Sequence, residues 1–448
     1  MSKKRKLPEP VVPQWGEDSD DNEDDDFTLE SLNKRLRHSP RDTTLEPDTE
    51  RVLYQAGKKG PRDRKRDRDR LKGKEDKEQD EQRGVLIHSS DLTASQPDYE
   101  RVFEGEGDVP EIVLQYPSFA RTETFALVTP RDSNNYKPID DIINTVEQIL
   151  LFYLPPDLAA KHTNELTGFP RRLRRAVHDL SLDKFTAAVR DFNTLIRTSL
   201  LDETIQRHMS SVRALPFALT EHILGQTYMR TVSPAVHLLK QYENGTDNVY
   251  GELLPRFAAQ IFHDTALSSR HTFVDLGSGV ANVVLHAALQ SGAEAWGIEV
   301  MPNPARMAAE QVREFRARCL RWGLVPGRVR VIQGDFLACP EIDTALRGAD
   351  VVLVNNQAFF PALNDALLMK FLDLKEGCRV VSLKSFVPDK WVTKRRNVED
   401  PRNLLTVERR EYWSGFVSWT DAGGTYFVAK KDSGRLRAFL DGGGAGSD

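Results

Sequence analysis

The chain has 448 residues, and its 62 Lys and Arg against 67 Asp and Glu give a formal net charge of −5. This near balance excludes a polycation, so any attraction to nucleic acid has to come from local basic tracts. The three cysteines, Cys319, Cys339 and Cys378, exclude a disulfide framework and a cysteine-based zinc site, and we expect no metal. No apolar run approaches the ~18 residues that a membrane span needs, and no signal peptide is evident, so we expect a soluble intracellular protein.

Charge runs dominate the first hundred residues. Lys3 to Lys6 is a basic tetrad, Glu17 to Asp26 is an acidic block, and Lys58 to Lys74 holds ten Lys and Arg against three Asp. No apolar periodicity accompanies these runs, so we predict that residues 1–105 form a disordered tail. The tetrad is typical of nuclear import signals, and the second basic tract is typical of segments that bind DNA phosphates, which favours a nuclear location. The alternative is a solvated tail that only keeps the protein soluble.

The next part of the chain, residues 106–236, has the pattern of a mainly helical lobe without a catalytic signature. Its apolar residues follow strand spacing first and helical spacing afterwards. The pattern predicts a strand pair near residues 112–115 and 124–128, then helices from Pro138 to before Pro155, around 185–196, and over 217–228.

After Tyr250, short β-rich runs alternate with helical stretches, which predicts an α/β fold whose mostly parallel sheet is covered on both faces. We assign residues 237–433 to this domain and 434–448 to a flexible C-terminal tail. Strands are expected over residues 271–274, 294–298, 329–332, 350–354 and 378–383, and helices over 280–291, 303–322 and 362–373.

Acidic residues stand at the ends of the first three predicted strands. Asp275 precedes the glycine turn 277–279, Glu299 ends the second strand, and Asp335 with Phe336 follows the third. Ligands of open α/β sheets bind beyond these carboxyl ends. An aspartate at the turn would repel the pyrophosphate of NAD, whereas it suits a positively charged amino group. The pattern therefore favours S-adenosylmethionine as the cofactor and disfavours an NAD-dependent oxidoreductase.

The same pattern offers a contact for each further part of that cofactor. A carboxylate at Glu299 can take both ribose hydroxyls, Asp335 can accept the exocyclic N–H of adenine, and Phe336 can stack on the ring. The fourth strand ends in two amides, Asn355 and Asn356. Together these strand ends predict a class I S-adenosylmethionine-dependent methyltransferase with a Rossmann-like sheet.

Several motifs occur in the order seen in the non-SET histone H3 lysine methyltransferases, the disruptor of telomeric silencing family, which this chain resembles over residues 235–430. The charged tail resembles the fungal branch of that family. The resemblance implies transfer of methyl groups to a lysine in the folded core of histone H3 on nucleosomes, and a role in telomeric silencing. The motifs are Tyr250-Gly251-Glu252, Asp275-Leu276-Gly277-Ser278-Gly279-Val280, Gly334-Asp335-Phe336, Val354-Asn355-Asn356 and Val417-Ser418-Trp419-Thr420.

The resemblance also implies roles for individual residues. Asn355 and Tyr426 would line a narrow channel for the substrate lysine. We place Phe359 and Tyr426 in the channel wall, with core packing as the alternative for both. Arg396, with Lys394 and Arg395, would bind the acidic surface of the nucleosome, and we expect a monomer that also contacts nucleosomal DNA through its tail. The residues implied in cofactor binding are Tyr242, Glu243, Tyr250, Glu252, Asp275, Gly277, Gly279, Asn282, Glu299, Asp335, Phe336 and Asn355.

Three positions depart from the family pattern. Ala281 replaces a glycine of the glycine turn, Leu253 replaces a small hydroxyl residue, and Gln357 replaces a phenylalanine. They leave open a chromatin-binding module without turnover. A class I methyltransferase acting on RNA, a small molecule or another protein is the second alternative, although the asparagine pair differs from the N-P-P-Y motif of base-methylating enzymes.

No dedicated general base is expected in this mechanism. Free lysine has a pKa of about 10.4, so its amine has to lose a proton before it can attack a methyl group. An apolar channel that ends at a sulfonium cation disfavours the ammonium form through burial and like-charge repulsion. We expect Asn355 to position the reacting groups.

Overall fold

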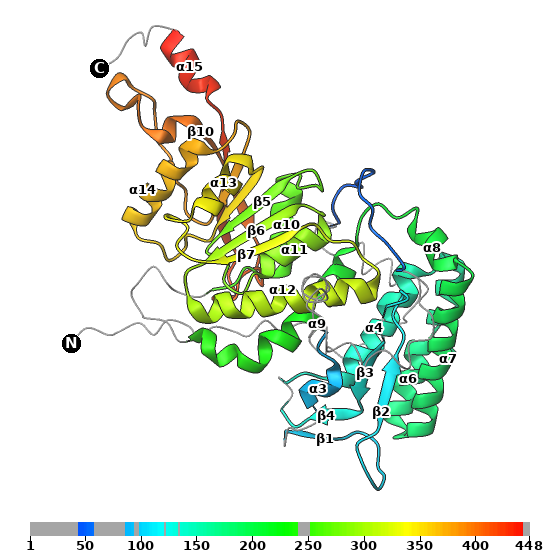
Figure 1. Ribbon diagram of the computed structural model, residues 1–448. Coiled ribbons are helices and arrows are strands. Elements are labelled where there is room, and N and C mark those ends of the chain that lie inside the picture. Colours follow the sequence, from blue (N-terminus) through cyan, green and yellow to red (C-terminus); the bar gives the residue numbers. More distant parts are fainter. Residues whose placement is uncertain are drawn as a thin grey trace, which may run out of the picture. The chain divides into compact units, whose positions relative to one another are not determined.

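The computed structural model describes residues 44–57, 86–93, 98–120, 122–132, 135–240 and 251–441 (Figure 1). These residues form two compact units. Unit 1 is built from the described residues within 235–310 and 327–441, and unit 2 from those within 44–234 and 311–326. The basic tetrad, the acidic block and the basic tract 58–74 lie outside the described residues.

A seven-stranded sheet forms the centre of unit 1. Its strands are β5 (Thr272–Leu276), β6 (Glu294–Glu299), β7 (Val329–Gln333), β8 (Val351–Val354), β9 (Arg379–Ser382), β10 (Leu405–Tyr412) and β11 (Gly424–Lys431). The strand order is β10-β11-β9-β8-β5-β6-β7. Strands β5 to β9 run parallel, whereas β11 is antiparallel to both β9 and β10. This topology confirms the predicted class I methyltransferase fold.

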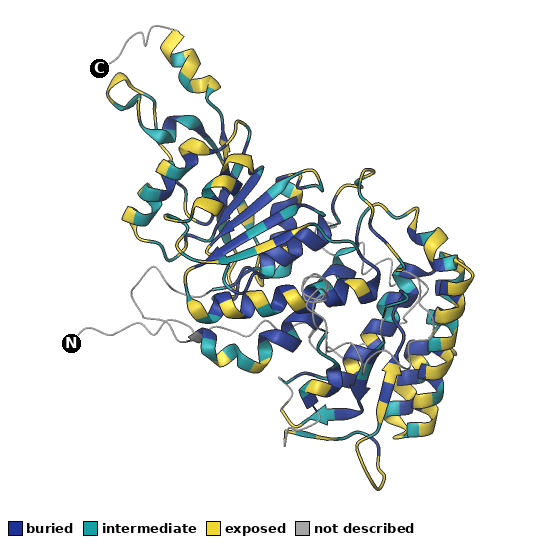
Figure 2. Cartoon of the chain, in the orientation of Figure 1, coloured by how far each residue is buried: buried dark blue, intermediate teal, exposed yellow. Residues whose placement is uncertain are grey.

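Helices cover both faces of this sheet, as the apolar strands require. Phe273 points to one face, where its ring meets that of Phe262 with centroids 5.6 Å apart. Val274 and Leu276 point to the opposite face and join the apolar core there. The central strands of the sheet are coloured mostly as buried in Figure 2. The helices of unit 1 are η1 (Ser233–Lys240), α10 (Pro255–Asp264), α11 (Asn282–Gln290), α12 (Pro302–Trp322), α13 (Pro340–Gly348), α14 (Pro361–Lys370), η2 (Phe371–Asp373), η3 (Arg395–Asn397), η4 (Pro401–Leu404) and α15 (Gly434–Asp441).

The two helical layers place a crevice at β5. Helix α11 packs on β5, β6 and β7, while α13 packs on β5 and β6 from the other face. The chain continues from β5 to β6 on one side and returns to β8 on the other. Ligands of open α/β sheets bind where the strand order reverses in this way. The fold therefore directs attention to the carboxyl ends of β5, β6 and β8.

Unit 2 is mainly helical. The helix predicted from Pro138 is observed and ends at Tyr153, and its predicted apolar face is fully buried. The elements are α3 (Ser89–Thr93), β1 (Tyr99–Arg101), β2 (Glu111–Leu114), β3 (Glu123–Ala126), β4 (Val128–Pro130), α4 (Pro138–Tyr153), α5 (Pro156–Thr163), α6 (Phe169–His178), α7 (Leu182–Leu201), α8 (Thr204–Met209) and α9 (Phe217–Thr231). The second half of α12, residues 311–322, also belongs to this unit.

Two predicted boundaries differ from the structure. Part of the segment predicted as a disordered tail belongs to unit 2, because Tyr54 is buried and its hydroxyl donates to the Pro117 carbonyl at 2.7 Å. Residues 89–93 likewise form α3. The predicted flexible C-terminal tail begins with the helix α15. These pieces are short, and the segment around Tyr54 is also held by backbone hydrogen bonds to Phe119, Gly323 and Val325, which leave no apolar periodicity in the sequence.

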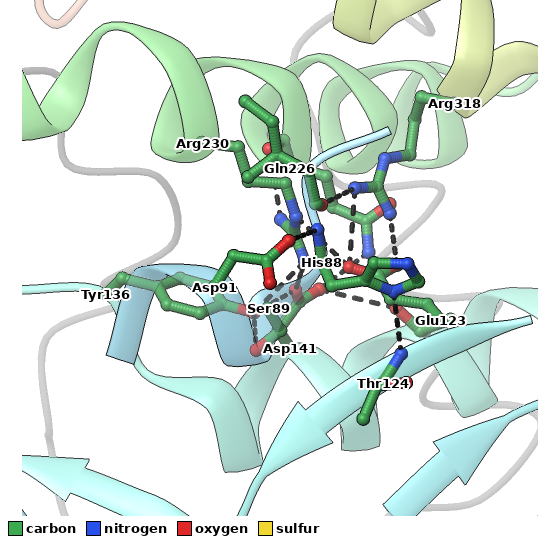
Figure 3. Close-up of polar contacts among 12 residues, drawn as sticks. His88, Ser89, Asp91, Glu123, Thr124, Tyr136, Asp141, Gln226, Arg230 and Arg318 are labelled. Atoms are coloured by element: carbon green, nitrogen blue, oxygen red, sulfur yellow. Dashed lines mark hydrogen bonds and ion pairs between the residues drawn. The ribbon is translucent and has the colours of Figure 1, made fainter. Parts of the chain in front are cut away.

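A buried ionic cluster lies inside unit 2 (Figure 3). It consists of Glu123, Asp141, Arg230, Glu314 and Arg318, whose side chains are almost fully removed from solvent. Arg230 contacts both Glu123 and Asp141 at 2.7 Å, and Arg318 bonds to Glu123 and to Glu314. Burial alone would raise the pKa of Glu123, but the two guanidinium groups reverse the effect and hold the pKa below its usual value.

The ionic cluster also holds the short segment 86–93. The Ile87 amide donates to Glu314 Oε2 at 2.7 Å, and the Tyr136 hydroxyl donates to Ser89 Oγ at 2.9 Å. The Thr124 amide of β3 donates to His88 Nδ1 at 3.1 Å (Figure 3). The segment is therefore fixed by polar contacts rather than by an apolar face. Within the described ranges, no helix is long and apolar enough to cross a bilayer.

Candidate functional site

A cavity of about 380 Å³ lies at the carboxyl ends of β5, β6 and β8. The parallel strands bring their ends to this edge, which explains why residues far apart in sequence meet there. Tyr242, Glu243 and Tyr250 of the predicted site lie outside the described residues, and Tyr426 is not among the lining residues. The predicted residues that line the cavity are Glu252, Asp275, Gly277, Gly279, Asn282, Glu299, Asp335, Phe336, Asn355 and Phe359.

A tight glycine turn forms one wall of the cavity. Gly277 has φ 86° and Gly279 has φ 55°, and the amides of Gly277 and Ser278 both donate to the Ile298 carbonyl of β6. Ala281, which departs from the family pattern, has φ 71° directly before α11. This left-handed conformation costs an L-residue about 1–2 kcal/mol. The turn keeps its shape despite that strain, and its glycines let a ligand approach the backbone.

Two buried carboxyl groups, Asp275 and Glu299, stand beside this turn. Glu299 accepts hydrogen bonds from the amides of Gly279 at 2.9 Å and Met301 at 2.8 Å, one at each oxygen. Burial raises the pKa of Glu299, although these amides oppose the shift. The carboxyl of Asp275 has no hydrogen-bond or ion-pair partner among the described residues. Burial, together with the charge of Glu299, raises the pKa of Asp275 to about 8.

This electrostatic arrangement suits a ligand with a positive charge near Asp275. A cation there would replace the missing hydration of the carboxylate and offset the repulsion from Glu299. The Glu299 carboxylate has about four acceptor positions, so its backbone N–H donors, Gly279 and Met301 among them, leave room for a hydroxyl donor. The pair therefore fits an amino group at one position and a ribose at the other.

An aromatic pair lies at another part of the cavity wall. The rings of Phe336 and Phe359 have centroids 6.2 Å apart and are tilted by 33°. A Cβ at Gly277 would lie 3.9 Å from the Phe359 ring, so this ring sits beside the glycine turn. Asp335 is exposed, and its Oδ1 accepts from the Leu337 amide at 2.8 Å. Aromatic faces next to an exposed carboxylate suit a flat ring that carries an N–H donor.

The two asparagines after β8 have different surroundings. Asn356 is buried, and its amide makes four hydrogen bonds, to Asn364, to the amides of Leu383 and Lys384, and to the Lys384 carbonyl. Asn355 donates through Nδ2 to the Gly251 carbonyl at 3.2 Å. Its Oδ1 is buried without a hydrogen-bond partner in the described part of the chain. A buried amide oxygen of this kind needs a donor, which a ligand in the cavity can supply.

The segment 251–253 closes one side of the cavity and is clasped by the Val-Ser-Trp-Thr motif. The Glu252 amide donates to Ser418 Oγ at 2.9 Å, and the Ser418 amide donates back to the Glu252 carbonyl at 3.0 Å. Trp419 packs so closely on Gly251 that a Cβ there would lie 2.8 Å from its ring. Leu253 is buried and forms a β-bridge with Val417. The departure at Gln357, in contrast, is exposed and does not line the cavity.

Tyr426 lies away from the lining because helix α10 holds its hydroxyl. The hydroxyl donates to Asp264 Oδ2 and accepts from Gln260 Nε2 at 3.1 Å. The residue is fully buried, and burial with the nearby Asp264 carboxylate raises its pKa. These α10 partners could not be found from sequence, because neither stands in a recognisable motif.

The predicted basic residues occupy an exposed loop of unit 1. Lys394, Arg395 and Arg396 are all exposed, at the start of η3. The role of these residues in nucleosome binding stays a prediction. The sequence did not predict the structural roles of Asn356 and Ser418, although both residues stand inside motifs that were recognised. Asn356 pairs all its amide hydrogen-bonding groups, and Ser418 exchanges hydrogen bonds with Glu252.

Comparisons with known proteins identify the relatives of the chain. Residues 228–430 match the family described as Histone methylation protein DOT1. The chain is 51% identical over 358 residues to the H3 lysine-79 specific histone-lysine N-methyltransferase of Aspergillus fumigatus, covering 80% of this chain and 71% of that protein. It is 49% identical over 365 residues to the protein of the same name from Emericella nidulans, covering 81% and 73%.

Two further proteins resemble the chain at lower sequence identity. The H3 lysine-79 specific enzyme of Yarrowia lipolytica is 38% identical over 324 residues, covering 72% of this chain and 66% of that protein. Among solved structures, an O-methyltransferase from Bacillus cereus in complex with SAH covers 47% of this chain and 90% of that chain, with 12% identity and a TM-score of 0.31. The fold assignment rests on the strand order and not on this likeness.

Proposed function

Because the chain belongs to the fungal branch of the DOT1 family of histone methylation proteins, we propose that it is a nuclear histone-lysine N-methyltransferase. The reaction transfers methyl groups from S-adenosylmethionine to a lysine of histone H3, the one numbered 79 in the names of the relatives. The observation that carries this proposal is the single cavity where Asp275, Glu299, Asp335 and Asn355 meet. The substrate in this proposal is H3 within nucleosomes.

The lining residues fit the cofactor part by part. Asp275 would bind the amino group, because its buried carboxyl has no positively charged partner among the described residues. Glu299 would bind the ribose hydroxyls, held ready by its two backbone hydrogen bonds. Asp335 and Phe336 would bind the adenine, with Phe359 beside them. Gly277, Gly279 and Asn282 form the wall at the start of α11.

S-adenosylmethionine would supply a sulfonium methyl group, which an amine can attack as the carbon–sulfur bond breaks and the neutral thioether S-adenosylhomocysteine leaves. The contribution of the chain is to bring a neutral lysine amine to it in line. Asn355 Oδ1 would accept one N–H of that amine, which orients the nitrogen lone pair. The Gly251 carbonyl fixes the Asn355 side chain through its Nδ2 group, so the oxygen keeps one direction. Burial of the amine in the cavity favours its neutral form.

We also propose that residues outside the cavity bind the nucleosome. Arg396, with Lys394 and Arg395, would contact the acidic histone surface of the nucleosome. The basic tract 58–74 would add salt-sensitive contacts to nucleosomal DNA. Telomeric silencing would then follow from methylation of chromatin.

Transfer of a labelled methyl group from S-adenosylmethionine tests the proposal directly. Intact nucleosomes, free histones and naked RNA serve as parallel substrates for the full chain. We expect label on histone H3 when it is presented in nucleosomes. Label on RNA alone would replace the proposed substrate class. Measurable cofactor binding without label on any substrate would show a binding module without turnover.

A further inference from the structure

The loop that carries Lys394, Arg395 and Arg396 is held by one buried amide. We propose that Asn403 is the positioning residue of this basic loop, which we define as residues 391–402. In this role, Asn403 fixes both flanks of the loop so that its cations meet the nucleosome in one prepared arrangement. The inference rests on the proposed function, because it assumes that the loop contacts the nucleosome.

The Asn403 side chain uses its full hydrogen-bonding capacity inside the loop. Its Oδ1 accepts from Trp391 Nε1 at 3.0 Å and from Thr393 Oγ1 at 2.8 Å. Its Nδ2 donates to the Asn397 carbonyl and to the Val398 carbonyl, the latter at 3.3 Å. An amide oxygen has two lone pairs and an amide nitrogen has two N–H groups, so all four are paired. The partners stand on both sides of the three cations.

A second asparagine continues the same frame. Asn397 Oδ1 accepts from the Lys394 amide at 2.6 Å, and its Nδ2 donates to the Val392 carbonyl at 3.0 Å. Since Asn403 bonds to the Asn397 carbonyl, the two amides form a continuous network under the cations. Apart from the single turns η3 and η4, the backbone of the basic loop is therefore fixed by side-chain hydrogen bonds and not by a sheet.

The neighbouring Arg402 ties this frame to the rest of unit 1. Its guanidinium forms ion pairs with Asp365 of α14 and, at 3.1 Å, with Asp400. The same guanidinium lies over the Trp391 ring, 5.6 Å from its centroid. The ion pair between Arg402 and Asp365 therefore connects the basic loop to α14, a helix of unit 1.

Burial separates the positioning residue from the contact residues. Asn403 is only 5% exposed, whereas the three cations are exposed. Asn403 cannot touch a partner and can act only through the loop. A loop that is already ordered binds with less loss of conformational entropy than one that must be ordered on contact. Loss of the amide should therefore weaken nucleosome binding without changing the methyl-transfer step.

The test is a double-mutant cycle in the full chain with Asn403→Ala and Arg396→Ala. The measured quantities are kcat and KM for methylation of nucleosomes, and the Kd for S-adenosylhomocysteine. We expect Asn403→Ala to raise KM about tenfold, a change in binding free energy of about 1.4 kcal/mol. Turnover and cofactor Kd should stay within about twofold. In the Arg396→Ala background, the same substitution should change KM by less than about twofold, because coupled residues are not additive.

Two further variants separate positioning from general loss of stability. Asn403→Asp keeps the acceptor oxygen but places a carboxylate oxygen against the Asn397 and Val398 carbonyls, so its KM should rise at least as much as that of Asn403→Ala. Asn193→Ala removes a comparable amide from unit 2, where it donates to the Val113 carbonyl at 2.7 Å and accepts from the Gln115 amide at 2.8 Å. This control should leave the nucleosome KM within about twofold of the wild-type value.

Each outcome decides for or against the positioning role. An unchanged KM for Asn403→Ala would overturn it, as would an equal effect of that substitution with and without Arg396. A fall in kcat at constant KM would also overturn it, since the loop would then act on the chemical step. Absence of transfer by the wild-type chain would overturn the proposed function itself, and the inference with it.

Discussion

At the end of β8, neighbouring residues of the same type have separate tasks. Asn356 uses its whole amide to join the end of β8 to residues 383–384 and to Asn364 of α14. Asn355 leaves one buried oxygen for a ligand. The sequence motif marks both positions, but only the hydrogen bonds distinguish the structural residue Asn356 from Asn355, which we propose faces the substrate.

We predict that Asn355→Ala lowers kcat at least about a hundredfold, because a reacting group that is misplaced by about 1 Å can cost that much. The affinity for S-adenosylhomocysteine should stay within a few-fold. Labelled methyl transfer and isothermal titration calorimetry measure the two quantities. Unchanged turnover would remove Asn355 from the mechanism.

The matched control is Asn356→Ala, which leaves several backbone groups without partners. Each buried group that loses its partner costs about 1–3 kcal/mol, so we expect a loss of stability of about 2–4 kcal/mol. Urea unfolding measures this change. A stable Asn356→Ala variant would contradict the division of roles.

The buried carboxyl of Asp275 predicts how cofactor binding depends on pH. With a pKa of about 8, this group is mostly protonated at neutral pH, and only its ionised form attracts an amino group. Affinity for S-adenosylhomocysteine should therefore rise with pH, by up to about tenfold per unit between about pH 6 and 8. Calorimetric titrations across this range measure it. Asp275→Asn should bind weakly at every pH, and a flat wild-type profile would contradict the assignment.

At the scale of elements, the position of the segment 251–253 depends on contact with Trp419. Any side chain at Gly251 meets that ring at 2.8 Å, so the segment or the tryptophan has to move. Because the Gly251 carbonyl orients Asn355, the movement should reach the reacting groups.

We therefore expect Gly251→Ala to lower kcat at least about tenfold while the protein stays folded. Steady-state kinetics and circular dichroism check the two parts of this prediction. Gly334→Ala is the control, because a Cβ there meets only the end of Ile298 at 3.8 Å, an ordinary contact. Its kcat should stay near that of the wild type, and equal losses in the two variants would contradict the argument.

Most elements that were predicted from sequence are either buried along their length or buried along one regular face. The strands β5, β6, β8 and β9 are short, largely buried apolar runs, and α4 has a clear apolar face, so periodicity identified them. The edge strand β7 was identified by its β-branched residues, although only Val329 is buried. Strands β10 and β11 were not predicted, because β10 is an edge strand whose exposed residues include Glu408 and Arg409. Helix α13 has only nine residues, too few for a distinct period. The clasps at Asn356 and Ser418 depend on partners far along the chain, which no local pattern reveals.

At the scale of the molecule, the ionic cluster predicts where unit 2 is most sensitive. Glu123 contacts both Arg230 and Arg318, and all three side chains are fully buried. Replacing it by glutamine leaves two guanidinium groups with less compensating charge. Removal of one partner from a buried ion pair costs about 3–5 kcal/mol.

We therefore predict that Glu123→Gln lowers the free energy of unfolding by about 3–5 kcal/mol. The control is Glu310→Gln, which removes the exposed pair with Arg306 and should cost about 0–1 kcal/mol. Urea unfolding of both variants measures the difference. Similar values for the two would show that burial does not decide the strength of these pairs.

The basic tract 58–74 can be tested without disturbing the fold. Deleting the first hundred residues would also remove Tyr54 and Ser89, which belong to unit 2. We propose instead to replace the ten Lys and Arg of the tract by glutamine. Nucleosome affinity should fall, and its logarithmic dependence on salt should become shallower by about one unit for each phosphate that the tract no longer neutralises. An unchanged salt slope would leave the tract as a solubility device.

The ionic cluster also has a consequence for folding during translation. A ribosome releases the first 234 residues before it makes Glu314, Arg318 and Trp322, yet unit 2 needs all three. Trp322 donates to Gln226, and Arg318 neutralises Glu123, so the early chain holds these partners without their counterparts. Domains usually complete themselves in the order of translation. In this chain, unit 2 can complete its fold only after α12 has been synthesised, and α12 follows β5 and β6 of the sheet in unit 1.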